Sequence, residues 1–91
     1  MNRNKTKTSI NAPDWHRAQI QCALRMKGYS LAQLSREYGL SSGTLANALS
    51  KPWLKGELII AMKIGIPPEK IWPSRYYDDE KPVKRILRKV Y

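Results

Sequence analysis

The sequence predicts an all-α fold of five short helices, and three observations support this prediction. Apolar residues recur at helical spacing in successive segments, whereas no segment alternates between apolar and polar residues as a half-buried strand does. Most of these segments end at a glycine or before a proline, where helices commonly stop. Serine or aspartate stands before several of them, in the position of an N-cap. At 91 residues the chain suits one small domain with tails.

Two helices are predicted in the first half of the chain. The first spans residues 15–27, with Asp14 as its N-cap and a glycine after its last turn. The second follows Ser30, because Ser30 and Gln33 have the spacing of a capping box. Leucine and tyrosine recur at helical spacing behind this cap, and Gly39 ends the helix after two turns.

Three further helices are predicted before the tail. The third begins at Ser41 or Ser42 and ends near Ser50, because a proline two residues later disfavours helix at the position before it. The fourth, over residues 56–64, is apolar on most sides and is closed by a glycine. The fifth is a short turn over residues 69–72, which starts after a pair of prolines and stops at the next proline.

These helices are expected to form one domain between two basic ends. Residues 1–13 are predicted to be a flexible basic arm, residues 14–77 the folded domain and residues 78–91 a separate basic tail. From Val83 onward the tail carries apolar residues at positions i, i+3, i+4, i+7 and i+8 with basic residues opposite, a pattern that predicts a short amphipathic helix. A helix of about nine residues is marginal alone, so it needs a surface to pack against.

The composition favours a polyanionic partner and argues against a metal protein or an enzyme. The net charge is +10, and basic residues outnumber acidic ones in all three parts of the chain. Such a charge attracts nucleic acid first, although charge alone does not separate DNA, RNA and an anionic membrane. Cys22 and His16 are the only cysteine and histidine, too few for an intrachain disulfide, a zinc finger or a nucleophilic triad. We therefore expect no metal, no cofactor and no catalysis, with Cys22 buried, His16 near the surface and Trp15 against the core.

No secretory or membrane segment is expected either. The basic start of the chain runs into no apolar stretch. The longest apolar run, residues 58–62, is far below the roughly 20 residues that a transmembrane helix needs. A reducing, cytoplasmic setting, in association with the nucleoid, fits this composition.

The most informative segment is LAQLSREYGLSSGTLANALS, residues 31–50. It holds two short helices joined by a tight turn, and its apolar residues are expected to pack these helices together at a steep angle: Leu34, Tyr38, Leu40, Leu45 and Ala48. This is a helix-turn-helix pattern, in which the second helix enters the major groove of DNA, a groove about 12 Å wide. Two ordinary helices of a bundle are the alternative interpretation of the same spacing.

The candidate contacts with DNA lie on and around the second of these helices. Base contacts are expected from short side chains near its start: Ser42, Gly43, Thr44 and Asn47. Asn47 carries the donor and acceptor that match adenine, and Gly43 allows the backbone to approach closely. Phosphate contacts are expected from polar and basic residues nearby: Ser30, Gln33, Ser41, Lys51, Trp53, Lys55 and Arg75. A contact of Asn47 with phosphate alone is the alternative to base recognition.

Four motifs also resemble a known family: DWHRAQI, LSREYGLSSGTLANAL, KGELIIA and IWPSRY. They are similar to the Ner family, which comprises small repressors of Mu-like phages and related bacterial regulators. The resemblance covers about two thirds of the chain, residues 14–76. It implies a compact five-helix fold like that of lambda-repressor DNA-binding domains, control of promoters by operator binding without a cofactor, and a recognition helix over residues 42–49. It leaves open whether transcription is repressed or activated, and it does not cover the tail.

The function expected from these observations is regulation of transcription, preferably repression, by sequence-specific binding to double-stranded DNA, with a second copy of the chain as a possible partner on DNA. No small-molecule ligand is expected. An antitoxin-like interaction module that grips a protein partner with the tail is the alternative, and deletion of residues 78–91 distinguishes the two. Binding of the tail to an anionic membrane is disfavoured, because the tail is short and lacks tryptophan.

Overall fold

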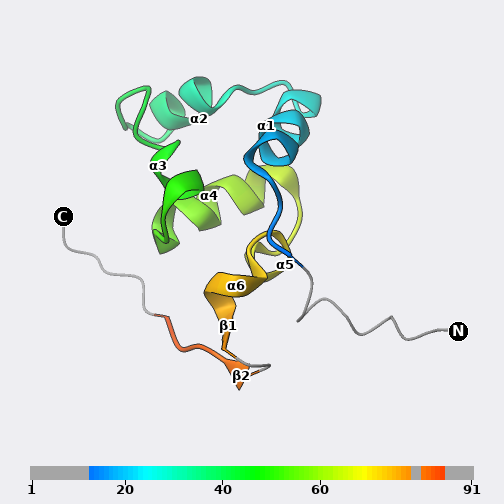
Figure 1. The fold of residues 1–91 in the computed structure, drawn as a ribbon. Coiled ribbons are helices and arrows are strands. Elements are labelled where there is room, and N and C mark those ends of the chain that lie inside the picture. Colours follow the sequence, from blue (N-terminus) through cyan, green and yellow to red (C-terminus); the bar gives the residue numbers. More distant parts are fainter. Residues whose placement is uncertain (1–12, 79–80, 86–91) are drawn as a thin grey trace, which may run out of the picture.

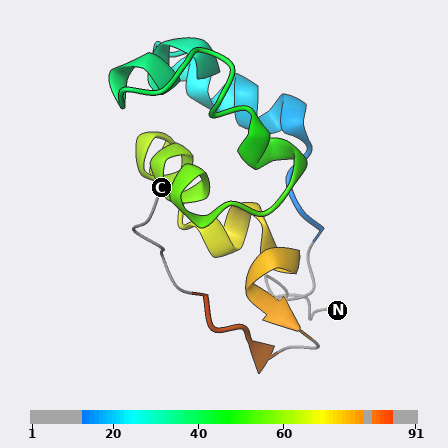
Figure 2. The same cartoon turned by 90° about the vertical axis from the view of Figure 1, so that its left-hand side faces the viewer.

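The computed structural model describes residues 13–78 and 81–85, most of which form short helices (Figure 1). In chain order the elements are α1 (Arg17–Met26), α2 (Leu31–Glu37), α3 (Asn47–Ser50), α4 (Leu54–Ile64), α5 (Pro68–Ile71), α6 (Pro73–Tyr76), β1 (Tyr77–Asp78) and β2 (Lys81–Pro82). Helix α4 lies between α1 and α2 at one end of the molecule and α5, α6 and the β-hairpin at the other, as Figure 1 and Figure 2 both show. The predominantly helical class predicted from the sequence is confirmed.

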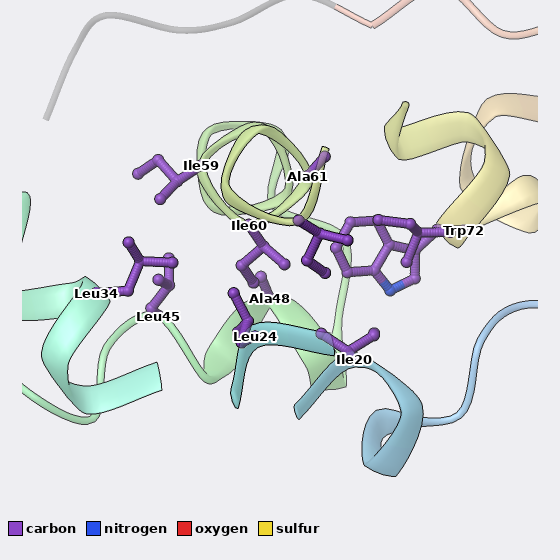
Figure 3. Packing of buried hydrophobic residues seen from close by; sticks show 11 residues of the cluster. Ile20, Leu24, Leu34, Leu45, Ala48, Ile59, Ile60, Ala61 and Trp72 are labelled. Atoms are coloured by element: carbon purple, nitrogen blue, oxygen red, sulfur yellow. The ribbon is translucent and has the colours of Figure 1, made fainter. Parts of the chain in front are cut away.

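Helix α4 is the centre of the hydrophobic core. Figure 3 shows Ile60 pointing from α4 toward Leu24 of α1 and Ala48 of α3, and all three side chains are buried. The core draws on α1, α2, the segment before α3, α3 itself, α4 and α5 with the residue after it: Ile20, Leu24, Leu34, Leu45, Ala48, Ile59, Ile60, Ala61, Ile64, Ile71 and Trp72. Each fully buried Leu or Ile side chain contributes roughly 1.5–3 kcal/mol to folding. Trp15 packs against this cluster, as predicted.

The first helix begins later than predicted, and its cap is a different residue. Helix α1 starts at Arg17, and Nδ1 of His16 accepts a hydrogen bond of 3.0 Å from the backbone N–H of Ala18. The backbone N–H of His16 in turn donates to the side chain of Gln19, at 2.7 Å, which completes a capping box. The prediction of Asp14 as the N-cap is therefore wrong.

Asp14 instead holds the start of helix α6, sixty residues away in sequence. Its carboxylate accepts hydrogen bonds from the backbone N–H of Ser74, at 2.9 Å, and from the hydroxyl of Ser74, at 2.6 Å. Helix α6 exists because Pro73 both ends one helical turn and begins the next, where its fixed φ angle suits the first helical position. The predicted fifth helix corresponds to α5, whereas α6 was not predicted because Pro73 was expected only to stop a helix, and six helices occur among the described residues.

The second helix follows its prediction closely. The hydroxyl of Ser30 accepts from the backbone N–H of Gln33, at 3.1 Å, and the side chain of Gln33 accepts from the backbone N–H of Ser30, at 3.0 Å. The predicted capping box is therefore present. Tyr38 is 45 % exposed, so its predicted place between the two helices is wrong, and Cys22 is exposed rather than buried. Cys22 lies between the buried Ile20 and Leu24 in sequence and so falls on the outer side of α1.

Two short strands replace part of the predicted tail. Strands β1 and β2 pair antiparallel, with Tyr77 opposite Pro82 and Asp78 opposite Lys81. Strands of two residues are too short to show the alternation on which sequence analysis depends, which explains why they were not predicted. The tail helix expected from Val83 does not begin within residues 83–85, which are not helical. Its remaining residues, 86–91, lie outside the described part of the chain, as does most of the predicted N-terminal arm, residues 1–12.

Candidate nucleic-acid interface

Hydrogen bonds to Ser35 hold the turn between α2 and α3. The backbone N–H of Leu40 donates to the carbonyl of Ser35, at 3.0 Å, just after Gly39 has reversed the chain with a φ of 76°. The hydroxyl of Ser35 accepts from the backbone N–H of Leu45, also at 3.0 Å. Ser35 and Leu45 are fully buried, so this bond fixes the approach to α3 against α2 from inside the core.

The same bond explains why the third helix is shorter than predicted. Helix α3 covers only Asn47–Ser50, whereas residues 42–46 form hydrogen-bonded turns. The N–H of Leu45, which in an α-helix would donate to the carbonyl of Ser41, donates to Ser35 instead. The Ser41 carbonyl accepts from Thr44, at 3.0 Å, which is the tighter i to i+3 spacing. The predicted start at Ser41 or Ser42 is therefore the start of a turn, and we name residues 41–50 as a whole the recognition segment.

The structure brings the four predicted base-contacting residues together on the recognition segment. Ser42, Gly43 and Asn47 are exposed, and Thr44 is half-buried. No heavy atom lies within 4 Å of the position that a Cβ on Gly43 would occupy, so the backbone is open to close approach on that side. The hydroxyls of Ser41 and Thr44 lie 2.7 Å apart and hydrogen-bond each other. Leu45 and Ala48, both fully buried, hold the opposite side of the segment in the core.

A hollow adjoins these residues where the recognition segment passes into α4. It has a volume of about 290 Å³ and is lined by Thr44, Asn47, Lys51, Pro52 and Trp53. Sequence analysis assigned Thr44 and Asn47 to base contacts and Lys51 and Trp53 to phosphate contacts. Their common surface was not predictable, because it depends on the irregular residues 51–53 between α3 and α4, for which no spacing rule exists.

Of the seven predicted phosphate contacts, Ser41 lies on the recognition segment and Trp53 lines the hollow, and the other five fall into three groups. Ser30 and Gln33 are exposed at the start of α2, where each is engaged in the capping box of the other. Lys51 is exposed directly after α3, and Lys55 is half-buried on the first turn of α4. Arg75 differs from both, because its side chain is only 10 % exposed.

The guanidinium of Arg75 binds inside the domain rather than at its surface. Its Nη1 donates to the carbonyl oxygen of Ala48, at 2.6 Å, and to Oε2 of Glu57, at 3.1 Å. It also stacks over the ring of Trp72, 4.9 Å from the ring centroid. In this structure the Arg75 side chain connects α6 to the end of the recognition segment and to α4, and its predicted contact with phosphate stays a prediction.

Glu57, which sequence analysis overlooked, is the most densely bonded residue described. Its carboxylate is completely buried and accepts from the backbone N–H of Trp53, at 2.7 Å, from the hydroxyl of Tyr76, at 2.7 Å, and from Arg75. Arg85 binds it with both terminal nitrogens, Nη1 to Oε1 at 2.5 Å and Nη2 to Oε2 at 3.1 Å. We name these five residues the Glu57 cluster. The signal that could have indicated it was a single acidic residue in a helix that is apolar on most sides.

The electrostatics of the Glu57 cluster follow from burial and pairing. Burial alone raises the pKa of Glu57, but hydrogen bonds from Arg85, Tyr76 and the Trp53 N–H outweigh it and leave the pKa below its ordinary value. Burial and the hydrogen bond to Glu57 raise the pKa of the Tyr76 hydroxyl well above its ordinary value. Glu57 is therefore ionised and Tyr76 neutral at neutral pH, and both side chains are hydrogen-bonded within the domain.

The Glu57 cluster also fastens the start of the tail to the domain. Arg85 lies over the ring of Tyr76, 4.7 Å from its centroid, in addition to its bonds to Glu57. The backbone N–H of Val83 donates to the carbonyl of Tyr76, at 2.8 Å. Residues 83–85 are thus tied to α4 and α6 rather than separate from them.

The described part of the chain holds neither a metal-binding cluster nor a membrane-spanning helix. No group of three or more His, Cys, Asp and Glu residues among residues 13–78 and 81–85 is arranged to hold a metal ion. Within the same residues no helix has the length and apolar character needed to cross a membrane.

Comparison with known proteins agrees with this geometry. The family described as winged helix-turn-helix DNA-binding matches residues 14–88. The sugar fermentation stimulation protein B of Escherichia coli (strain K12) is 60 % identical over 70 residues, which cover 77 % of this chain and 76 % of that protein. The negative regulator of transcription of Escherichia phage Mu is 51 % identical over 69 residues, covering 76 % and 92 %.

A solved structure supports the same assignment. The solution structure of the Mu Ner protein has a TM-score of 0.62 to this structure at 46 % sequence identity, and the match covers 81 % of this chain and 93 % of that one. The family match also extends past residue 76 into the segment that Arg85 fastens to α4. The chain therefore belongs to the winged helix-turn-helix DNA-binding family and, within it, to the Ner family.

Proposed function

We propose that the protein is a transcriptional regulator that binds specific double-stranded DNA by inserting the recognition segment into the major groove. The observation that carries this proposal is the two-sided character of the segment. Leu45 and Ala48 are fixed in the core, whereas Ser42, Gly43 and Asn47 are exposed and short enough for the backbone to approach base edges. The net charge of +10 supplies the attraction to phosphate.

Asn47 is the residue that we propose reads a base. It is exposed at the first position of α3, and its amide offers the donor and acceptor that pair with N7 and N6 of adenine. Ser42 and Thr44 support it from the preceding turns. Lys51, four residues after Asn47, is suited to a phosphate beside the groove.

Repression is the sign of regulation that we propose. A protein whose site overlaps a promoter represses by occupying it, which requires affinity alone, whereas activation needs a further surface for the transcription machinery. One relative is named a negative regulator of transcription and another a sugar fermentation stimulation protein, so the names of relatives point in both directions. Such a function places the protein on the nucleoid, in the cytoplasm.

A pair of copies on DNA is part of this proposal. One recognition segment presents few base contacts, and a second half-site supplies the missing specificity. Two segments related by a twofold axis would read half-sites about 34 Å apart, one helical turn of DNA, or a multiple of that distance.

The proposal is tested by selecting bound duplexes from a random pool and footprinting the result. We expect a preferred sequence with two half-sites and a steep salt dependence, with a slope of log K against log salt of roughly −4 to −5 for four to six phosphate contacts. Placing the selected sequence over a promoter in a reporter strain should lower expression. A pool without any preferred sequence contradicts specific recognition, and increased expression contradicts repression alone.

The alternative, a module that grips a protein partner with its tail, keeps one supporting observation. Val83 is 41 % exposed at the start of the apolar pattern of the tail. The deletion that tests it should begin after Arg85 rather than at residue 78, because Arg85 belongs to the Glu57 cluster. A chain ending at residue 85 that still binds its selected DNA supports the regulator, and one that loses only a protein partner supports the module.

A further inference from the structure

The hollow beside the recognition segment has walls that are mostly carbon. Trp53, Pro52 and Lys51 line one part of it, and Asn47 and Thr44 line the part formed by the recognition segment. At about 290 Å³ it lies just below the range for ligand pockets, roughly 300–1,000 Å³. The hollow is open to solvent, so it suits a small apolar group carried on a larger molecule better than an enclosed ligand.

The ring of Trp53 is fixed in this wall by its neighbours. Its backbone N–H donates to the buried carboxylate of Glu57, at 2.7 Å. The ring packs directly over Gly56, where an added Cβ would lie only 2.8 Å from Cζ3 of the indole and 3.0 Å from the Cβ of Ala48. Only glycine at position 56 leaves room for this placement, so the wall of the hollow is pre-formed.

Thr44 completes the apolar side of the hollow. Its hydroxyl is hydrogen-bonded to the hydroxyl of Ser41, 2.7 Å away. Thr44 lines the hollow, and because its hydroxyl is engaged we infer that its methyl group makes the contact there. Asn47, three residues later on the same segment, provides a polar amide at the edge of the hollow, and Lys51 provides a positive charge.

We propose that this hollow receives the 5-methyl group of a thymine in the major groove, at or next to the base pair that Asn47 reads. The inference rests on the proposed function and adds the chemical group that the site selects. Among the four unmodified bases only thymine presents a methyl group in the major groove, and on an A·T pair that methyl lies along the same edge as the adenine atoms that asparagine binds. An apolar hollow beside an exposed amide matches that edge.

The same group occurs on 5-methylcytosine, so the chemistry that the hollow recognises is a 5-methylpyrimidine. Thymine pairs with adenine and 5-methylcytosine pairs with guanine, and the experiment below distinguishes the two. Thymine fits the adenine preference of Asn47, and it is the occupant to which the proposal commits.

The experiment replaces each thymine of the selected DNA site, one at a time, by deoxyuridine, which removes only the methyl group. We expect one thymine in each half-site, adjacent to the position read by Asn47, to lose about fourfold in affinity, the factor that corresponds to burying one methyl group. Other thymines should change little. Methylation of a cytosine placed at that position should raise affinity relative to unmodified cytosine, because it adds the same 5-methyl group.

Three variants assign the effect to the hollow. Thr44→Ser keeps the hydroxyl and removes the methyl group, so the ratio of affinities for the thymine and uracil duplexes should move toward one. Thr44→Val keeps a methyl group, so this ratio should stay unchanged whatever the overall affinity of the variant. Lys51→Gln should weaken binding to both duplexes equally. Equal affinity for thymine and uracil at every position overturns the inference while leaving DNA recognition intact, and so does a ratio unchanged in Thr44→Ser. Failure to select any preferred sequence removes the proposed function itself.

Discussion

The recognition segment and the Glu57 cluster meet at Trp53, which belongs to the cluster and lines the hollow beside the segment, and their polar groups are used in opposite ways. In the Glu57 cluster a buried carboxylate receives hydrogen bonds from two guanidiniums, a phenol and a backbone N–H. On the recognition segment Ser42 and Asn47 are exposed to solvent. The polar side chains of this small domain thus fall into two groups. Those of the Glu57 cluster bond within the fold and hold α4, α6 and residue 85 together. Those of the recognition segment lie at the surface, where a partner can reach them.

Substitution at Glu57 should produce the largest loss of stability. Glu57→Gln keeps the size of the side chain but removes the charge that faces Arg75 and Arg85, and breaking a buried pair in this way typically costs about 3–5 kcal/mol. We expect a loss near 3 kcal/mol, because both guanidiniums retain a route to solvent at 10 % and 16 % exposure. Urea unfolding should show a lower midpoint with an unchanged m value.

Glu37→Gln is the matched control for this variant. Glu37 is also a carboxylate that accepts from a tyrosine hydroxyl, that of Tyr29, at 3.0 Å, but it is exposed. Its loss should stay within about 0.5 kcal/mol, as for other surface substitutions. Equal effects at both positions would show that burial of the Glu57 cluster does not govern its strength.

The pH dependence of stability should identify the same residue. The pKa of Glu57 is lowered in the fold, so its contribution is complete above the ordinary value of 4.5 and is lost as pH falls through the lowered folded value. The pKa of Tyr76 is raised, so its contribution is complete below the ordinary value of 10.0 and declines as pH rises above it. Thermal unfolding across pH should therefore show an acid limb that Glu57→Gln reduces. An identical acid limb in the two proteins would contradict this assignment.

On the recognition segment the expected effect moves from stability to binding. Asn47→Ala should weaken binding to the preferred site by about 1–3 kcal/mol and relax preference at one base position, since the amide is proposed to read a base. Its unfolding free energy should change by less than about 0.5 kcal/mol, because Asn47 is exposed. Binding to the selected site and to random duplexes should be compared in the same buffer. Full retention of site preference would exclude base recognition by Asn47.

Ser35 combines features of both regions, because it is buried like Glu57 but its hydroxyl bonds to the recognition segment. Ser35→Ala leaves the N–H of Leu45 without its acceptor, 3.0 Å away, and an unsatisfied buried donor costs about 1–3 kcal/mol. The freed N–H can turn to the carbonyl of Ser41 and extend α3, so we expect a loss at the low end, about 1 kcal/mol. Increased helical circular dichroism should accompany it. A stability loss without added helix would show that the segment keeps its turns for another reason.

The sequence predicted best those features that depend on neighbours in the chain. Ser30 and Gln33 are three residues apart, and their capping box is present. Gly39 turns the chain where predicted. The missed features join distant residues: Asp14 with Ser74, Ser35 with Leu45 and Glu57 with Arg85. No periodicity encodes such pairs, because they arise only when separate helices have packed.

The candidate site shows the same division. The residues predicted to contact bases follow one another on one segment, so their common position was predictable, whereas their contact with bases stays a prediction. The contribution of Trp53 to the hollow was not, because it depends on the space left by Gly56. Arg75 was assigned to phosphate on charge alone, and charge does not reveal that a buried carboxylate lies 18 residues earlier in the chain.

Lys51 and Arg75 provide the smallest and most specific comparison, because sequence analysis gave both the same role. Lys51 is exposed beside the hollow, whereas Arg75 donates to Ala48 and Glu57 inside the domain. Lys51→Gln should weaken binding to all duplexes by a similar factor and reduce the magnitude of the slope of log K against log salt by about one, the share of one phosphate contact. Arg75→Gln should lower the unfolding temperature and leave that slope unchanged under conditions where the variant is folded. Titrations at four salt concentrations measure both slopes. A slope that decreases in Arg75→Gln but not in Lys51→Gln would reverse the two assignments, and it would mean that Arg75 leaves Glu57 when DNA binds.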